Sequence, residues 1–121
     1  MVRPVPDRGV VVFRVVATDD REAGAFIDSF KSNSALGKPP RPNSPEGDYL
    51  LVHQAISVFD YRYQAEAMAR RFPLGDFVAA LRLPGAQGLC MARWGSKGHL
   101  SLWGEALMLA QTAADIVRVG N

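Results

Sequence analysis

The residues best suited to chemistry gather in the segment GHLSLWGEAL, residues 98–107. The chain has two histidines and two tryptophans, and this segment holds one of each. If it is a strand, His99, Ser101 and Trp103 share one face, and Glu105 follows just beyond the second glycine. Histidine can act as a general base, and tryptophan can wall a binding site. The segment is therefore interpreted either as a site or as the solvent side of a half-buried strand.

A second candidate is Arg14, a charge within the β-branched run VVVFRVV at residues 10–16. The run predicts a strand in which Arg14 shares a face with three valines. Its guanidinium either snorkels from an edge position or faces a cleft as a functional cation. Arg14, Ser57 and His99 are each a polar exception in an apolar strand pattern, so we predict that they line one shared cleft.

The elements that must position these residues follow from hydrophobic periodicity. Besides residues 10–16 and the strand around residue 101, the patterns predict strands over 76–84, 89–94 and 114–119, with a short helix or turn over 105–113. Residues 49–60 are expected as one strand or two short ones, with His53 as a core histidine. The order β, α, β, α and then mostly β predicts an α+β domain whose sheet is largely antiparallel.

Two main helices are predicted, over residues 18–33 and 60–72. Asp19 and Glu22 are expected to form a capping box at the start of the first helix, and Phe26 and Phe30 to dock it on the core. Asp60 is the expected N-cap of the second helix. Its predicted buried stripe consists of Tyr61, Ala65, Met68 and Phe72.

Residues 34–48 contain four prolines and two glycines, a composition that is incompatible with regular structure. Residues 37–47 are expected to be the most mobile internal segment. Lys38 and Arg41 suggest either a phosphate-contacting flap or an ordinary solvated loop. With residues 1–9 as an N-terminal arm, the 121 residues are expected to form a single domain.

Composition narrows the function classes. A net charge of +2 with dispersed basic residues disfavours a nucleic-acid partner. Cys90 is the only cysteine, which excludes an internal disulfide, and the separated histidines argue against a metal site. No signal peptide or bilayer-length apolar run is present, so a cytoplasmic location without membrane contact is expected, although effector export remains open. Walker, dinucleotide-fingerprint, HExxH and GxSxG motifs are absent.

Three stretches carry a resemblance to a group of small bacterial proteins that is common in actinobacteria. They are FRVV (13–16), ISVFDYRYQAEAMARRFPLGDFVAALRLP (56–84) and GHLSLWGEALML (98–109). The resemblance spans most of residues 12–119. Its layout is similar to the ADP-ribosyltransferase fold, with a compact, split sheet that is mostly antiparallel.

In transferases of the arginine-serine-glutamate class, the arginine holds the NAD phosphates, the serine supports a ribose and the glutamate orients a ribose hydroxyl. The resemblance therefore implies NAD as the substrate, with Arg14 as the arginine and Ser57 as the serine. Glu105 is the carboxylate considered for the catalytic role, with His99 as a general base or ribose donor. Tyr61 or Trp103 is the expected nicotinamide wall, beside Ser101. The acceptor is not implied.

Three functions remain open at this point. The first is an NAD-binding ADP-ribosyltransferase or NAD-cleaving domain with a toxin-like or defence role. The second is a non-catalytic interaction module that works with a protein partner on the same fold. The third is a small ribonuclease with His99 as base and Arg93 and Lys97 at the phosphate.

Overall fold

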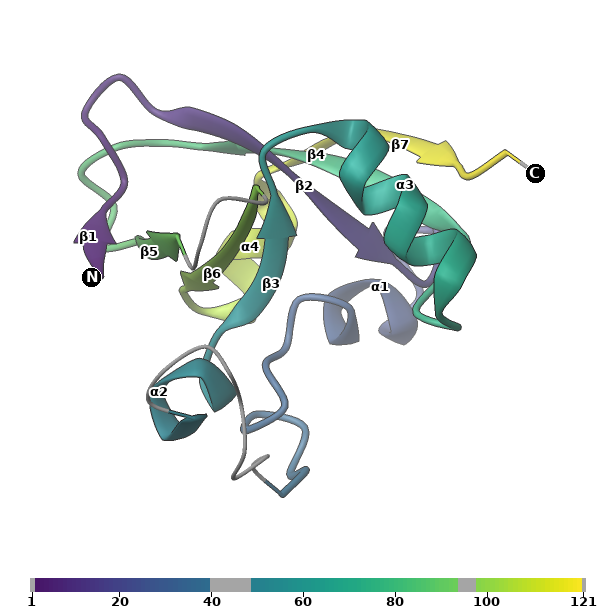
Figure 1. Cartoon of the computed structure of the whole chain (residues 1–121), viewed down its shortest axis with the longest axis horizontal. Helices are drawn as coiled ribbons and strands as arrows, with labels where there is room; N and C mark the ends of the chain where they lie inside the picture. Colours follow the sequence, from purple (N-terminus) through teal and green to yellow (C-terminus); the bar gives the residue numbers. More distant parts are fainter. Residues whose placement is uncertain (1, 40–48, 94–97, 121) are drawn as a thin grey trace.

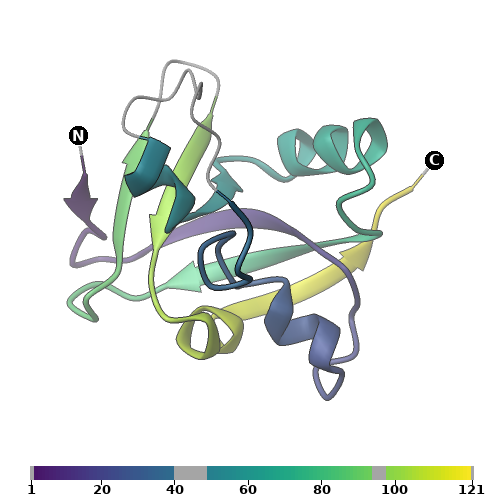
Figure 2. The same cartoon turned by 90° about the horizontal axis from the view of Figure 1, so that it is seen from below.

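The computed structural model describes residues 2–39, 49–93 and 98–120. Seven strands form one sheet in the order β1-β5-β6-β3-β2-β4-β7, and all the pairs are antiparallel (Figures 1 and 2). The predicted α+β class with a largely antiparallel sheet is therefore confirmed. The strands are β1 (Arg3–Pro4), β2 (Val10–Val16), β3 (Ile56–Phe59), β4 (Phe77–Leu83), β5 (Cys90–Arg93), β6 (His99–Trp103) and β7 (Ala113–Arg118).

The described helices are all short. They are α1 (Gly24–Asp28), α2 (Tyr49–His53), α3 (Arg62–Arg71) and α4 (Ala106–Gln111). Helices α1 and α4 pack on one face of the sheet, and α3 packs on the other face. The prediction of two main helices is thus half correct, because only α3 reaches ten residues.

Each face of the sheet has its own hydrophobic cluster, as the alternation in residues 10–16 predicted. The major core lies under α1 and α4 and includes Val12 and Val16 of β2. The minor core lies under α3 and includes Val15, Phe59 and Ala65. Arg14 lies two residues from Val12 and two from Val16 of the major core. Its side chain therefore emerges on the same face as theirs, the α1 side of the sheet.

The pairing between β2 and β3 is the shortest in the sheet. Strand β2 pairs along its whole length with β4, whereas it pairs with β3 only at Phe13 and Phe59. The two strands diverge beyond that pair (Figure 1). This opening is where Arg14 and Ser57 lie, on either side of the divergence.

The first predicted helix is shorter than expected. Residues 18–23 form turns in which the Thr18 hydroxyl accepts from the Asp20 amide and the Asp20 carboxylate accepts from the Glu22 amide. Such local side-chain bonds compete with helix formation, so the capping box of Asp19 and Glu22 does not form. At the other end, the Ser29 carbonyl is bound by Arg14 and the helix ends there.

Phe26 and Phe30 are nevertheless buried as predicted. They are only 4% and 1% exposed, and their rings contact edge to face with centroids 5.3 Å apart. The two phenylalanines dock the chain between residues 24 and 30 on the major core. Their burial thus fixes Ser29, whose carbonyl lies between them in sequence.

The strand prediction for residues 49–60 is wrong in the first half of that segment. Residues 49–53 are helix α2, and only Ile56–Phe59 form a strand. A short apolar run does not distinguish a strand from a buried helix by periodicity, which explains the error. His53 ends α2 half-buried, and its carbonyl accepts from the Ser34 amide, so it is not a core histidine within a strand.

Helix α3 buries a narrower stripe than predicted. Ala65 is fully buried and Met68 packs against the minor core, but Tyr61 and Phe72 are 58% and 42% exposed. Tyr61 rather than Asp60 is the N-cap, and the Gln64 side chain accepts from the Tyr61 amide at 3.1 Å. The helix therefore starts one residue later than expected.

The predicted N-terminal arm is anchored to the sheet. Strand β1 pairs with β5, and Val5 is buried, with its amide donating to the Leu89 carbonyl at 3.0 Å. Most of the segment predicted to be mobile, residues 40–47 with Arg41 among them, lies outside the described residues. Among the described helices, none has the length and apolarity that a membrane span requires.

Candidate functional site

Arg14 occupies the opening between β2 and β3. Its Nε and one terminal nitrogen donate to the Ser29 carbonyl at 3.1 and 3.0 Å, and the other terminal nitrogen donates to the Ser57 carbonyl at 2.8 Å. Strand β2 is interior to the sheet, between β3 and β4, so the edge interpretation of Arg14 is wrong. The guanidinium instead ties three elements together: β2, the end of α1, and β3.

The charge of Arg14 has no carboxylate partner among the described residues. The ion pairs there join other residues, and both acceptors of Arg14 are neutral carbonyls. Desolvation lowers the pKa of Arg14 to about 10, which leaves it cationic at neutral pH. The opening therefore holds a poorly hydrated positive charge.

Ser57 and His99 meet on the opposite face. The Ser57 hydroxyl lies 3.0 Å from His99 Nε2, and the two residues are diagonal neighbours, since Phe59 pairs with His99 and Ser57 pairs with Ser101. Ser57 is exposed, whereas Ser101 is only 2% exposed. The expected grouping of His99, Ser101 and Trp103 on one face agrees with this register.

The aromatic members of the site are fixed by different contacts. Trp103 is half-buried, and its indole nitrogen donates to the Leu51 carbonyl of α2 at 3.0 Å. The His99 ring packs against Phe59, with centroids 5.6 Å apart and planes 36° apart. Trp103 thus joins β6 to α2, and Phe59 braces the imidazole against the minor core.

Tyr61 borders the site close to Gly98, the residue that precedes β6. The Asp60 amide donates to the Gly98 carbonyl at 3.0 Å, which places the start of α3 beside His99. Gly98 has φ 76°, a left-handed conformation that favours glycine, and a Cβ there would only displace the end of the flexible Gln64 side chain. Tyr61 stacks on Tyr63, with ring centroids 5.7 Å apart, and both rings are more than half exposed.

The predicted site residues are only partly brought together. Ser57 and His99 are in contact, but Arg14 lies on the other face and reaches only the Ser57 backbone, so the prediction that all three side chains line one cleft is wrong in that respect. Alternation along β2 and β3 explains the difference. Arg14 shares the sheet face of Val12 and Val16 in the major core, whereas Ser57 shares the opposite face with Phe59 of the minor core. Glu105 is the exposed N-cap of α4, whose Leu109 and Ala110 pack on the major core.

Three groups that help to position the site residues had no clear signal in the sequence. The Ser29 carbonyl is a backbone group, which no residue type marks, and Gln64 looks like any polar residue on a helix. Phe59 lies in a predicted strand whose sequence pattern is apolar on both faces. Only the strand register reveals that Phe59 lies beside His99.

Of the two cations suggested for a ribonuclease, the structure describes only Arg93, and it is paired with a carboxylate. Arg93 is bound at both terminal nitrogens by the Asp60 carboxylate, one of these contacts being 3.0 Å, and this hydrogen bonding raises the pKa of Arg93. Lys97 lies outside the described residues. The described geometry therefore offers no phosphate-binding cation from this pair.

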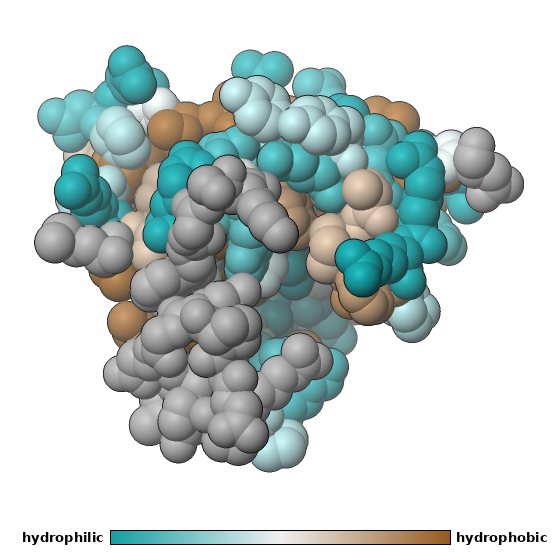
Figure 3. Space-filling model, in the orientation of Figure 1, coloured by the Kyte–Doolittle hydropathy of each residue, from teal (hydrophilic) through white to brown (hydrophobic). Residues whose placement is uncertain are grey.

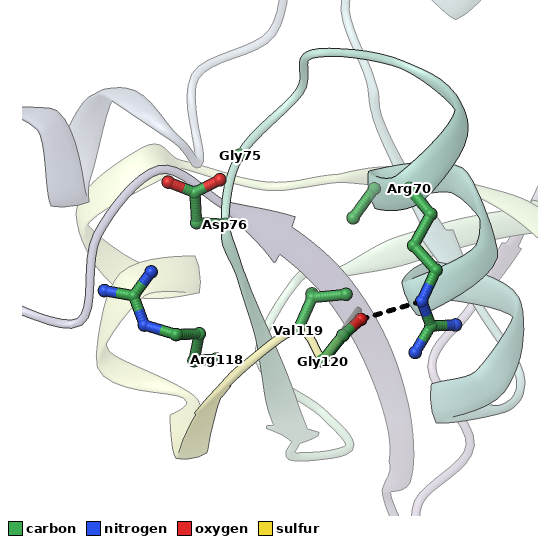
Figure 4. A pocket seen from close by; sticks show the side chains of 7 residues that line it. Arg70, Gly75, Asp76, Arg118, Val119 and Gly120 are labelled. Carbon is green, nitrogen blue, oxygen red and sulfur yellow. Dashed lines mark hydrogen bonds between the residues drawn. The ribbon is translucent and has the colours of Figure 1, made fainter.

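Two depressions of the described surface lie away from Arg14, Ser57 and His99. One, of about 410 Å³, is lined by Arg70, Asp76 and Arg118 together with backbone near the end of β7, and Arg70 donates to the Gly120 carbonyl across it (Figure 4). Another, of about 390 Å³, lies near β1 and is lined partly by Arg3 and Arg93. In the part of Figure 3 not drawn in grey, hydrophobic residues appear in several separate places among hydrophilic ones.

In residues 2–39, 49–93 and 98–120, no three His, Cys, Asp or Glu side chains group as metal ligands. Comparison with family models, with curated proteins and with solved structures gave no match.

Proposed function

We propose that the protein binds NAD in the manner of an ADP-ribosyltransferase, with the pyrophosphate at Arg14. The observation that carries this proposal is the desolvated cation in the opening between β2 and β3, which no described carboxylate neutralises. A buried charge is costly without a counter-charge, so an anionic ligand is favoured there. A guanidinium also matches phosphate oxygens in geometry.

Arg14 keeps donors for such a ligand. A guanidinium has five N–H groups, and three of them donate to the Ser29 and Ser57 carbonyls. The same bonds hold the side chain in place, so little rotamer entropy is lost when a phosphate binds. Arg14 can therefore serve the fold and the ligand at the same time.

The remaining groups suit the other parts of NAD. Ser57 and His99 lie on the other face of the sheet from Arg14, so an NAD molecule held at Arg14 has to pass through the opening between β2 and β3 to reach them. There they offer a hydroxyl and an imidazole to ribose hydroxyls, and the rings of Tyr61 and Trp103 offer flat apolar surface to a planar base. The divergence of β2 from β3 supports the split sheet that the resemblance implies. The acceptor of the ADP-ribose, any protein partner and a toxin-like or defence role stay as expectations of the same proposal.

Titration with NAD in a thermal-shift assay tests this function. We expect millimolar NAD to raise the melting temperature of the wild type, because a ligand that binds only the folded state stabilises it. His99→Ala should lose most of this shift, whereas His53→Ala, which changes the other histidine, should retain it. A wild-type melting curve that NAD does not move would remove the proposal and favour the non-catalytic interaction module, in which Arg14 is purely structural.

Glu105 is the carboxylate proposed for NAD cleavage. We expect Glu105→Gln to leave the melting temperature and the NAD-induced shift unchanged, because Glu105 is exposed and its side chain does not cap α4. Release of nicotinamide, followed by chromatography, should fall by about 100-fold or more, the scale for losing one transition-state electrostatic contact. Wild-type release rates in the Glu105→Gln variant would show that Glu105 has no part in the reaction.

Replacement of Trp103 is expected to have two separate effects, one on NAD binding and one on the stability of the fold. Trp103→Ala should weaken NAD binding by about 1–3 kcal/mol through lost apolar contact. It should also destabilise the fold, because the hydrogen bond that joins β6 to α2 is lost. Calorimetry of NAD binding beside a denaturant titration measures the two effects separately. A variant that loses stability but keeps wild-type NAD affinity would assign Trp103 to the fold alone.

A further inference from the structure

We propose that Ser57 is an activated nucleophile with His99 as its general base, and that the protein transfers acyl groups from small activated esters through Ser57 to water. This activity goes beyond the proposed function, because it requires no NAD. It is carried by the Ser57–His99 contact and by the backbone environment of Ser57 in the opening of the sheet.

The nucleophile and the base are in place for proton transfer. The Ser57 hydroxyl is exposed and lies 3.0 Å from His99 Nε2, within the range that general-base catalysis requires. The imidazole is held by two features of the fold: its strand pairs with β3, and its ring packs against Phe59 at 5.6 Å. A base that is fixed by its surroundings needs little reorganisation to accept the proton.

The backbone of Ser57 supplies a donor for an oxyanion. In an antiparallel strand, the N–H and C=O of one residue point to the same side. The Ser57 carbonyl points into the opening, where Arg14 binds it at 2.8 Å, so the Ser57 amide points there too. The recorded β2–β3 pairing is limited to Phe13 and Phe59 and does not include Ser57. This amide can stabilise negative charge that develops next to Oγ, while Arg14, on the other face, holds the Ser57 backbone in place.

The reaction then follows two balanced steps. Neutral His99 takes the hydroxyl proton on Nε2 as Ser57 Oγ bonds to the ester carbonyl carbon, and the oxyanion forms. The carbon–oxygen bond to the alcohol breaks, and the alcohol leaves with the proton from His99. In the second step, water attacks the acyl-serine, His99 accepts its proton and returns it to Ser57 Oγ, and the carboxylic acid is released.

A fluorophosphonate probe tests the nucleophile directly. We expect the wild type to be labelled at Ser57, as located by tandem mass spectrometry, and to hydrolyse p-nitrophenyl acetate. Ser57→Ala should lose both reactions, and His99→Ala should slow labelling by about 100-fold or more. Ser34→Ala, which removes another exposed serine, should react like the wild type. Circular dichroism of each variant verifies that it is folded.

The pH dependence separates a base from a merely structural histidine. Wild-type labelling should accelerate as the imidazole loses its proton, and His99→Ala should lose this dependence. Absence of label in the wild type, label at other residues, or undiminished labelling of Ser57→Ala would overturn the inference. Because the probe assay contains no NAD, its failure leaves the NAD proposal intact, and a missing NAD response leaves the labelling result intact.

Discussion

Replacement of Arg14 by methionine is expected to lower the free energy of unfolding by about 2–3 kcal/mol. Methionine has a similar length but no donors, so the Ser29 and Ser57 carbonyls both lose their partner. Leaving an acceptor without a partner costs about 1–3 kcal/mol, and relief of the desolvated charge offsets part of the sum. Urea titration of both proteins measures the difference.

Arg14→Lys is the matched control for this prediction. Lysine keeps the charge but lacks the planar fork that serves two carbonyls on different elements. We expect it to lose less stability than methionine and to retain part of the response to NAD. Equal stability of the methionine variant and the wild type would mean that water replaces the guanidinium at both carbonyls, and Arg14 would not be a structural clamp.

Phe30→Ala is expected to cost about 3–5 kcal/mol, the range for removing a buried aromatic ring. Phe30 is 1% exposed in the major core and packs edge to face on Phe26. Loss of the ring should also loosen the segment that presents the Ser29 carbonyl to Arg14. Stability is measured by denaturant titration, provided that the variant still unfolds in a cooperative transition.

Phe72 provides the comparison of the same residue type. It is 42% exposed at the end of α3, so Phe72→Ala should cost less than about 1 kcal/mol. The sequence pattern placed both phenylalanines on buried helical stripes, and the structure separates them. Similar losses for the two variants would contradict this separation and would restore the predicted stripe on α3.

The strands were largely predictable because their residues are distinctive. The run VVVFRVV became β2 with the predicted bounds and the predicted division of faces. Strands β4, β5, β6 and β7 also formed within one or two residues of the expected positions. β-Branched runs closed by glycine and proline leave few alternatives. Helix α2 was missed because a five-residue apolar segment has no usable period.

The site was predictable as a set of residues but not as an arrangement. His99 and Ser57 were singled out as polar exceptions, and they are in contact, 42 residues apart in sequence. The position of Arg14 on the opposite face depends on how β2 aligns with β3, and alternation within one strand does not give that register. Its two partners are backbone carbonyls, which no residue type in the sequence marks.

Arg14 is expected to receive the pyrophosphate of NAD in the opening between β2 and β3. A crystal structure of the wild-type protein soaked with NAD tests it most directly. We expect a phosphate oxygen within hydrogen-bond distance of an Arg14 terminal nitrogen, with NAD passing through the opening so that a ribose lies beside Ser57 and His99 on the other face. The opposite result is NAD bound away from Arg14, or an opening that stays empty at saturating NAD. Either result would leave Arg14 as a structural residue and withdraw NAD binding at this site.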